Sequence, residues 1–76
     1  MKTFVLCKLT PGKEQAAVSA IRAMEGVTDV YLVFGGWDVI LTAEADTVDK
    51  LSNLVVSRVR GVDGVAATET LVTTGL

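Results

Sequence analysis

The sequence of 76 residues contains no histidine, one cysteine and one proline. Histidine is the side chain most often used as a general base and is the commonest metal ligand, so both kinds of site lack their usual residue. The single cysteine, Cys7, excludes an internal disulfide and fits a reducing compartment. One cysteine and dispersed carboxylates do not supply a convergent ligand set for a transition metal. We therefore expect no metal, no cofactor and no enzymatic activity.

Long apolar runs and basic clusters are absent from the sequence as well. No run of apolar residues approaches the roughly 18 that span a bilayer, and the N-terminal residues lead into an alternating segment rather than a signal peptide. The net charge is −2, and the seven Lys and Arg residues are scattered, so no basic stripe is available to neutralise phosphates. The sequence predicts a cytoplasmic protein with no membrane contact and no direct contact with nucleic acid.

Apolar residues, by contrast, are abundant. Half of the residues are hydrophobic and the mean hydropathy is +0.49. A chain of this length forms one domain and buries only about 60% of the surface of its unfolded state. The surplus apolar surface predicts contacts between copies of the chain, that is, a homo-oligomer.

The hydrophobic periodicity predicts a strand, a helix and a strand in each half of the chain. The expected strands are residues 3–9, 27–34, 38–44 and 65–73, and the expected helices are residues 12–25 and a segment from Asp46 or Thr47 to about Arg60. Thr10 is the expected N-cap of the first helix. The apolar stripe expected on the second helix comprises Val48, Leu51, Leu54, Val55 and Val59.

A repeat relates the two halves. Residues 21–27 (IRAMEGV) match residues 59–65 (VRGVDGV), with Arg, Gly and Val at equivalent positions. Because the connection in each strand-helix-strand unit must be right-handed, two such units joined by a hairpin favour the ferredoxin-like βαββαβ fold of the α+β class. We expect a four-stranded antiparallel sheet in the order 4-1-3-2, with both helices on one face.

The second face of such a sheet is polar when the protein is a monomer. In the first strand, however, Val5, Cys7 and Leu9 form one face, and the opposite set is also mainly apolar. We therefore expect a second copy to cover the open face, sheet on sheet, in an assembly of the dimeric α+β barrel type. Val5 or Leu9, whichever faces the partner, is the position where an aspartate is expected to break this dimer.

Gly35-Gly36-Trp37-Asp38 form the tip of the hairpin that joins the two halves. In a purely structural interpretation, the glycines supply positive φ, Trp37 fills an apolar gap and Asp38 bonds the amides of its own turn. In a functional interpretation, the glycine amides and Asp38 bind a small zwitterion. Thr68 and Thr70 share one face of the last strand. Either their hydroxyls bond a ligand, or threonine is simply a favourable residue in an edge strand. The pattern alone leaves these alternatives open.

The hairpin at residues 33–41, the helix from Asp46, and Gly64-Val65 followed by residues 68–72 together resemble the RAM domain, the effector-binding domain of the Lrp/AsnC (feast/famine) transcription regulators. The resemblance covers residues 4–73. In that family the RAM domain follows a DNA-binding helix-turn-helix module. Because the first strand begins at Thr3, this chain is similar to the stand-alone RAM proteins, with residues 1–76 as a single domain.

The resemblance implies sheet-packed dimers that associate into rings of octamer type or similar, with a small effector, typically an amino acid, between dimers. It also implies mixed assembly with full-length Lrp/AsnC regulators. Where the family more often has Tyr or Phe, this chain has the bulkier Trp37, which bears on the size of the ligand. The positions that match the family's effector-site segments are Gly35, Gly36, Trp37, Asp38, Thr68, Thr70, Leu71 and Val72.

Two other functions fit the same fold. One is a small enzyme of the dimeric α+β barrel type that acts on a small metabolite, for which Asp38 and Glu44 are the only candidate groups at the ends of the third strand. The other is a ring-forming structural protein without a ligand. The absence of histidine places the enzyme below the effector-binding domain.

Overall fold

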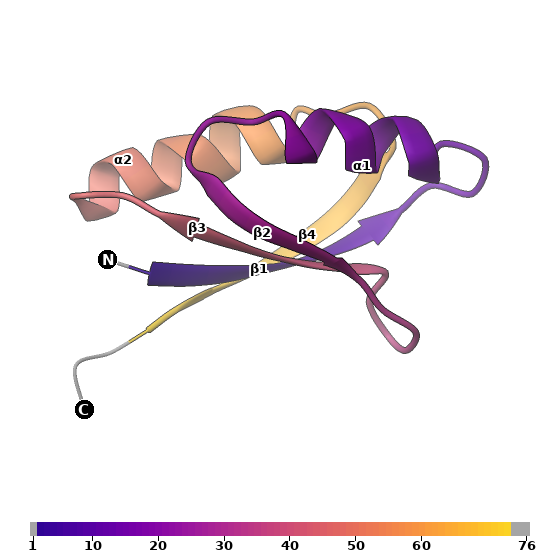
Figure 1. The fold of residues 1–76 in the computed structure, drawn as a ribbon, viewed down its shortest axis with the longest axis horizontal. Coiled ribbons are helices and arrows are strands. Elements are labelled where there is room, and N and C mark those ends of the chain that lie inside the picture. Colours follow the sequence, from indigo (N-terminus) through magenta and orange to yellow (C-terminus); the bar gives the residue numbers. More distant parts are fainter. Residues whose placement is uncertain (1, 74–76) are drawn as a thin grey trace.

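The computed structural model describes residues 2–73, apart from the side chain of residue 56. The second helical segment begins as an α-helix and continues directly as a π-helix, η1, and Figure 1 shows how the segments are arranged. The elements in chain order are β1 (Lys2–Leu9), α1 (Glu14–Arg22), β2 (Val27–Leu32), β3 (Val39–Glu44), α2 (Val48–Asn53), η1 (Leu54–Val59) and β4 (Val65–Val72).

The four strands form one antiparallel sheet in the order β2-β3-β1-β4. This is the predicted order 4-1-3-2 counted from the other edge. Both helical segments lie on the same side of the sheet (Figure 1). The ferredoxin-like βαββαβ fold of the α+β class is therefore confirmed, and β1 and β3 are the central strands.

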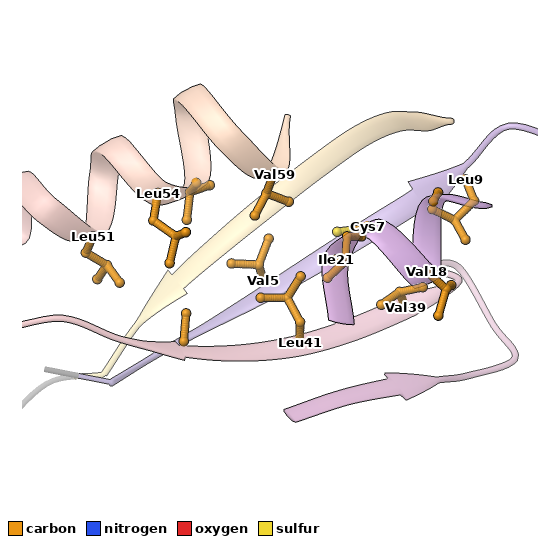
Figure 2. Packing of buried hydrophobic residues seen from close by; sticks show 13 residues of the cluster. Val5, Cys7, Leu9, Val18, Ile21, Val39, Leu41, Leu51, Leu54 and Val59 are labelled. Carbon is orange, nitrogen blue, oxygen red and sulfur yellow. The ribbon is translucent and has the colours of Figure 1, made fainter. Parts of the chain in front are cut away.

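The face of β1 that carries Val5, Cys7 and Leu9 points toward the helices. Val5 and Cys7 are fully buried and Leu9 is 6% exposed, whereas Phe4 and Leu6 on the other face are only half-buried. The prediction that Val5 or Leu9 faces a partner is wrong, because these side chains form the core of the single chain. Figure 2 shows Leu51, Leu54 and Val59 above Val5 and Leu41, with Val18 and Ile21 of α1 beside them.

The first helix is shorter than predicted. It begins at Glu14, its N-cap is Lys13, and no cap hydrogen bond from a side chain is found there among the described residues. Thr10 is therefore not the cap: its carbonyl accepts from the Lys13 amide at 3.0 Å, in a turn where Gly12 has a φ of 89°. The helix ends at Arg22, so the predicted extension to residue 25 is also wrong.

The second helical segment begins where it was predicted to begin. The Thr47 hydroxyl accepts from the Lys50 amide at 3.1 Å, which is an N-cap bond of the usual kind. Val48, in the first turn, is 57% exposed, so its predicted place in the buried stripe is wrong. The buried residues are Leu51, Leu54, Val55 and Val59, as predicted.

The sequence repeat has a structural counterpart in Gly26 and Gly64, which have φ values of 94° and 102° and each precede a strand. A Cβ at Gly26 would lie 3.0 Å from a methyl group of Leu54, and one at Gly64 would lie 3.1 Å from the Ala17 Cβ. Each glycine thus packs against the helix of the other half. Only glycine combines the positive φ with so close an approach.

Candidate functional site

The hairpin tip consists of residues 33–38, because β2 ends at Leu32 and β3 begins at Val39. The predicted strands were longer at both sides of the tip. The Val33 amide donates to the Asp38 carbonyl at 3.0 Å and closes the loop. Gly35 has a φ of 140°, and a Cβ at Gly35 or Gly36 would meet no described atom within 4 Å. Both glycines are exposed.

The amide and the side chain of Asp38 are bonded to β1, whereas its carbonyl closes its own turn. Its amide donates to the Cys7 carbonyl at 2.9 Å, and its Oδ2 accepts from the Leu9 amide at 2.8 Å. The structural interpretation, in which the Asp38 side chain bonds the amides of its own turn, is therefore wrong, because the partner of this side chain is the Leu9 amide. The side chain is half-buried and joins the tip of the hairpin to the end of a central strand.

A groove lies between the hairpin and the segment that leads into α1. Its volume is about 410 Å³, which falls in the range of small-ligand pockets. The walls are mostly apolar, with the carboxylates of Asp38 and Glu14 among them. Phe34 lines the groove although it is fully exposed in the single chain. The lining residues are Leu9, Pro11, Glu14, Leu32, Val33, Phe34 and Asp38.

The groove continues along the outer side of α1. A second hollow of about 430 Å³ shares Glu14 and Leu32 with the first and carries Arg22 at its rim. Because β2 is an edge strand, nothing within residues 2–73 covers its outer side at this point. The two hollows thus adjoin at Glu14 and Leu32.

The predicted site residues of β4 lie elsewhere on the sheet. Thr68 pairs with Cys7 and Thr70 with Val5, so the two residues share one face, as the alternation predicted, and that face is the helix-covered one. Leu71 pairs with Phe4 and therefore lies on the open face. Thr70 and Val72 border a cavity of about 330 Å³ beneath α2.

A single chain does not bring the hairpin tip and β4 together. In the sheet order β2-β3-β1-β4, strand β1 separates β4 from the hairpin strands. Trp37 is half-buried and does not line the groove, although it belongs to the predicted set. Within one chain, the predicted set is thus divided into a tip group, residues 35–38, and a β4 group, residues 68–72.

Of the seven groove residues, only Asp38 was among the predicted site residues. Leu32, Val33 and Phe34 directly precede the predicted tip, whereas the sequence analysis missed Leu9, Pro11 and Glu14 altogether. They precede or begin α1 and are far from the hairpin in the chain. The predicted strand order contained the signal that identifies them: when β1 and β3 are antiparallel neighbours, the end of β1 lies beside the start of β3. Leu9 must then lie beside Asp38.

Two observations on the described residues bear on nucleophilic and metal chemistry. Burial raises the pKa of the Cys7 thiol to about 11, so at neutral pH it is protonated and is not a nucleophile. Among residues 2–73, no group of three or more His, Cys, Asp or Glu side chains could hold a metal ion. None of the helices in this range is long and apolar enough to cross a membrane.

The fold and the groove place the chain in the class of small α+β domains with a ferredoxin-like sheet and a hollow beside the central hairpin. Comparison with known families then identifies it further. Residues 2–75 match the family described as the Lrp/AsnC ligand binding domain, so the chain belongs to that family. The predicted resemblance is confirmed.

Curated relatives of the chain are named as transcriptional regulators. An uncharacterized HTH-type transcriptional regulator of Pyrococcus horikoshii is 29% identical over 72 residues, which are 91% of this chain and 48% of the relative. The chain thus spans about half the length of the curated relatives that it matches.

Solved structures share the fold. The protein TTHA0845 of Thermus thermophilus is 29% identical, with a TM-score of 0.91 over 99% of this chain and 94% of that one. A transcriptional regulator of Neisseria meningitidis, solved as a complex with L-Met, has a TM-score of 0.83 over 99% of this chain and 51% of that one. At 17% identity, the second likeness concerns the fold alone.

Proposed function

We propose that this chain is an effector-binding and assembly domain whose ligand is an amino acid bound at the tip of the β2–β3 hairpin. The observation that carries the proposal is the groove of about 410 Å³ beside the tip. Its volume is near the lower end of the range for ligand pockets, which suits a single small metabolite. The family's description as a ligand-binding domain supports a ligand, and the L-Met complex of the Neisseria protein supports its class.

The chemistry of the groove matches an amino acid with an apolar side chain. Leu9, Leu32 and Phe34 supply apolar walls for the side chain of the ligand. Gly35 and Gly36 do not line the groove but follow Phe34 directly and are exposed, and we propose that their amides bind the carboxylate group, since consecutive backbone N–H groups form an anion-binding concavity. Asp38, which is half-buried, lies among the residues that line the groove.

The β4 group enters this proposal through assembly. Because Thr68, Thr70, Leu71 and Val72 are separated from the tip within one chain, they reach a ligand at the tip only from another copy. We infer that the complete site lies between copies, with a tip from one and a β4 edge from the next.

The open face of the sheet supports an assembly of copies. Phe4, Leu6 and Ile40 form a half-buried strip there, and Tyr31 and Leu71 are 55% and 49% exposed beside it. Lys8 and Glu69 lie on the same face and carry opposite charges, which suits contact between two identical faces related by a twofold axis. We propose a sheet-on-sheet dimer that associates into a ring, and mixed assembly with full-length Lrp/AsnC regulators as its regulatory role.

The effector proposal is tested by measuring the melting temperature of the protein with each proteinogenic amino acid. We expect apolar amino acids to raise it most, because the groove walls are apolar. If no amino acid raises the melting temperature, the proposal fails.

A variant at the tip locates the site. Gly36 has no positive φ, and a Cβ there meets nothing within 4 Å among the described residues, so Gly36→Val is expected to fold as the parent does. Its side chain covers the exposed amides, and we expect the ligand-induced rise to disappear while the melting temperature without ligand is unchanged. Gly36→Ala is the graded control, with an intermediate loss. A full response from Gly36→Val places the ligand elsewhere.

A further inference from the structure

The Asp38 side chain continues the β1–β3 ladder beyond the point where β3 begins. Val39, the first residue of β3, pairs with Cys7. Amides two residues apart on a strand point to the same neighbour, so the Leu9 amide also faces β3, one step past its first residue. The main chain of β3 offers it no partner there, and Asp38 Oδ2 accepts from it at 2.8 Å instead.

This bond is needed because Leu9 is buried. Leu9 is 6% exposed, and a buried amide without an acceptor costs about 1–3 kcal/mol. The next amide, that of Thr10, donates to the Gly64 carbonyl at 2.8 Å. The end of β1 is therefore held from two sides, by Asp38 on the hairpin side and by Gly64 at the start of β4.

The same bond connects the two walls of the groove. Leu9 and Pro11 form one wall, and the residues from Leu32 to Phe34 form the other. Asp38 belongs to the hairpin wall, because its carbonyl accepts from the Val33 amide at 3.0 Å, while its carboxylate holds the amide of Leu9. Within residues 2–73, no other hydrogen bond of a side chain joins these two walls.

We propose that Asp38 is a positioning residue for the groove, which acts through the Leu9 amide as a hydrogen-bond acceptor rather than through its negative charge on a ligand. The inference deepens the proposed function, on which it rests for the identity of the site. An acceptor oxygen at this position fixes the separation between the Leu9–Pro11 wall and the hairpin wall. An asparagine oxygen meets that requirement, and an alanine methyl group does not.

Two variants separate the acceptor from the charge. Asp38→Asn keeps an oxygen for the Leu9 amide and removes the charge, whereas Asp38→Ala removes both. Asp46→Ala is the control for the loss of one carboxylate, since its side chain is 87% exposed and lies away from the groove. Each protein is labelled with ¹⁵N, and amide hydrogen exchange is followed residue by residue.

We expect slow exchange at the Leu9 amide in the parent, Asp38→Asn and Asp46→Ala, and exchange at least tenfold faster in Asp38→Ala. Chemical shifts in Asp38→Ala are expected to change on both walls, residues 9–11 and 32–34, but not in α2. Titration with L-methionine is expected to give an affinity for Asp38→Asn within about threefold of the parent and a loss of at least tenfold for Asp38→Ala; tenfold corresponds to about 1.4 kcal/mol.

Two results overturn the inference. If Asp38→Asn loses as much affinity as Asp38→Ala while its Leu9 amide stays protected, the charge contacts the ligand directly. If Asp38→Ala keeps slow exchange at Leu9, the carboxylate does not hold the end of β1. Should no amino acid bind the parent, the proposed function fails, and the exchange and shift data alone decide whether Asp38 holds the two walls together.

Discussion

On the face of the sheet that the helices cover, Val5, Cys7 and Leu41 are fully buried, whereas on the opposite face Phe4, Leu6 and Ile40 are only half-buried. Both sets are apolar or nearly so, and they alternate along the same two central strands. The difference lies in what covers them, since the helices of one chain reach only one face. A single chain therefore completes one core and leaves the opposite apolar face partly exposed.

The largest expected effect is at Val5. An aspartate there is placed beneath η1 without a partner, and an uncompensated buried charge costs about 3–5 kcal/mol. A domain of this size has little stability to spare, so we expect Val5→Asp to lose its cooperative urea transition and its helical circular dichroism. A folded Val5→Asp protein would contradict the assignment of this face to the core.

The next effect is at Leu6, one residue along β1 on the open face. We expect Leu6→Asp to keep the helical circular dichroism of the parent, because Leu6 is half-buried and no helix packs on it. If a second copy covers this face, the new charge is buried in the dimer, and the molar mass from light scattering falls to that of the monomer. Ala20→Asp, on the exposed side of α1, is the control and should keep the mass of the parent. An unchanged mass for Leu6→Asp would show that the open face is not the interface.

The sequence was sufficient for the order of the strands and narrowed the cap of the second helix to Asp46 or Thr47, because both follow from local pattern and from the handedness of the connections. It was not sufficient to assign the two faces of β1. Val5 and Leu6 are both aliphatic, so alternation cannot say which one meets the helices. The choice depends on the direction in which the chain turns at Pro11-Gly12, where the predicted cap at Thr10 was wrong.

The candidate site, too, was predicted from the sequence only in part. The tip from Gly35 to Asp38 was evident from its glycines, and both glycines are exposed in the structure. The sequence analysis missed the hydrogen bond between Asp38 and the Leu9 amide. The two residues are distant in the sequence, and the bond forms only because β1 continues to Leu9 while its pairing with β3 ends at Cys7. The role of Thr68 and Thr70 in binding stays a prediction, since it depends on a second copy.

The smallest effect concerns Thr42, a polar residue buried on the open face. It is 4% exposed, its hydroxyl lies 2.6 Å from that of Thr28, and it donates to Asp29 Oδ2 at 3.2 Å. Thr42→Val keeps the shape and removes these bonds, while Thr28 and Asp29 are exposed and can bond water instead. We expect a loss of about 1 kcal/mol in the free energy of unfolding from urea titration.

Thr28→Val is the matched variant of this pair, because it removes the other hydroxyl at an exposed position. If the two hydroxyls bond each other, the double variant loses less stability than the sum of the single variants, by about 0.5 kcal/mol or more. Additive losses would mean that each hydroxyl is satisfied independently. In that case Thr42 contributes to the open face only by its shape, and Thr42→Val, which makes this face more apolar, should leave the assembly intact.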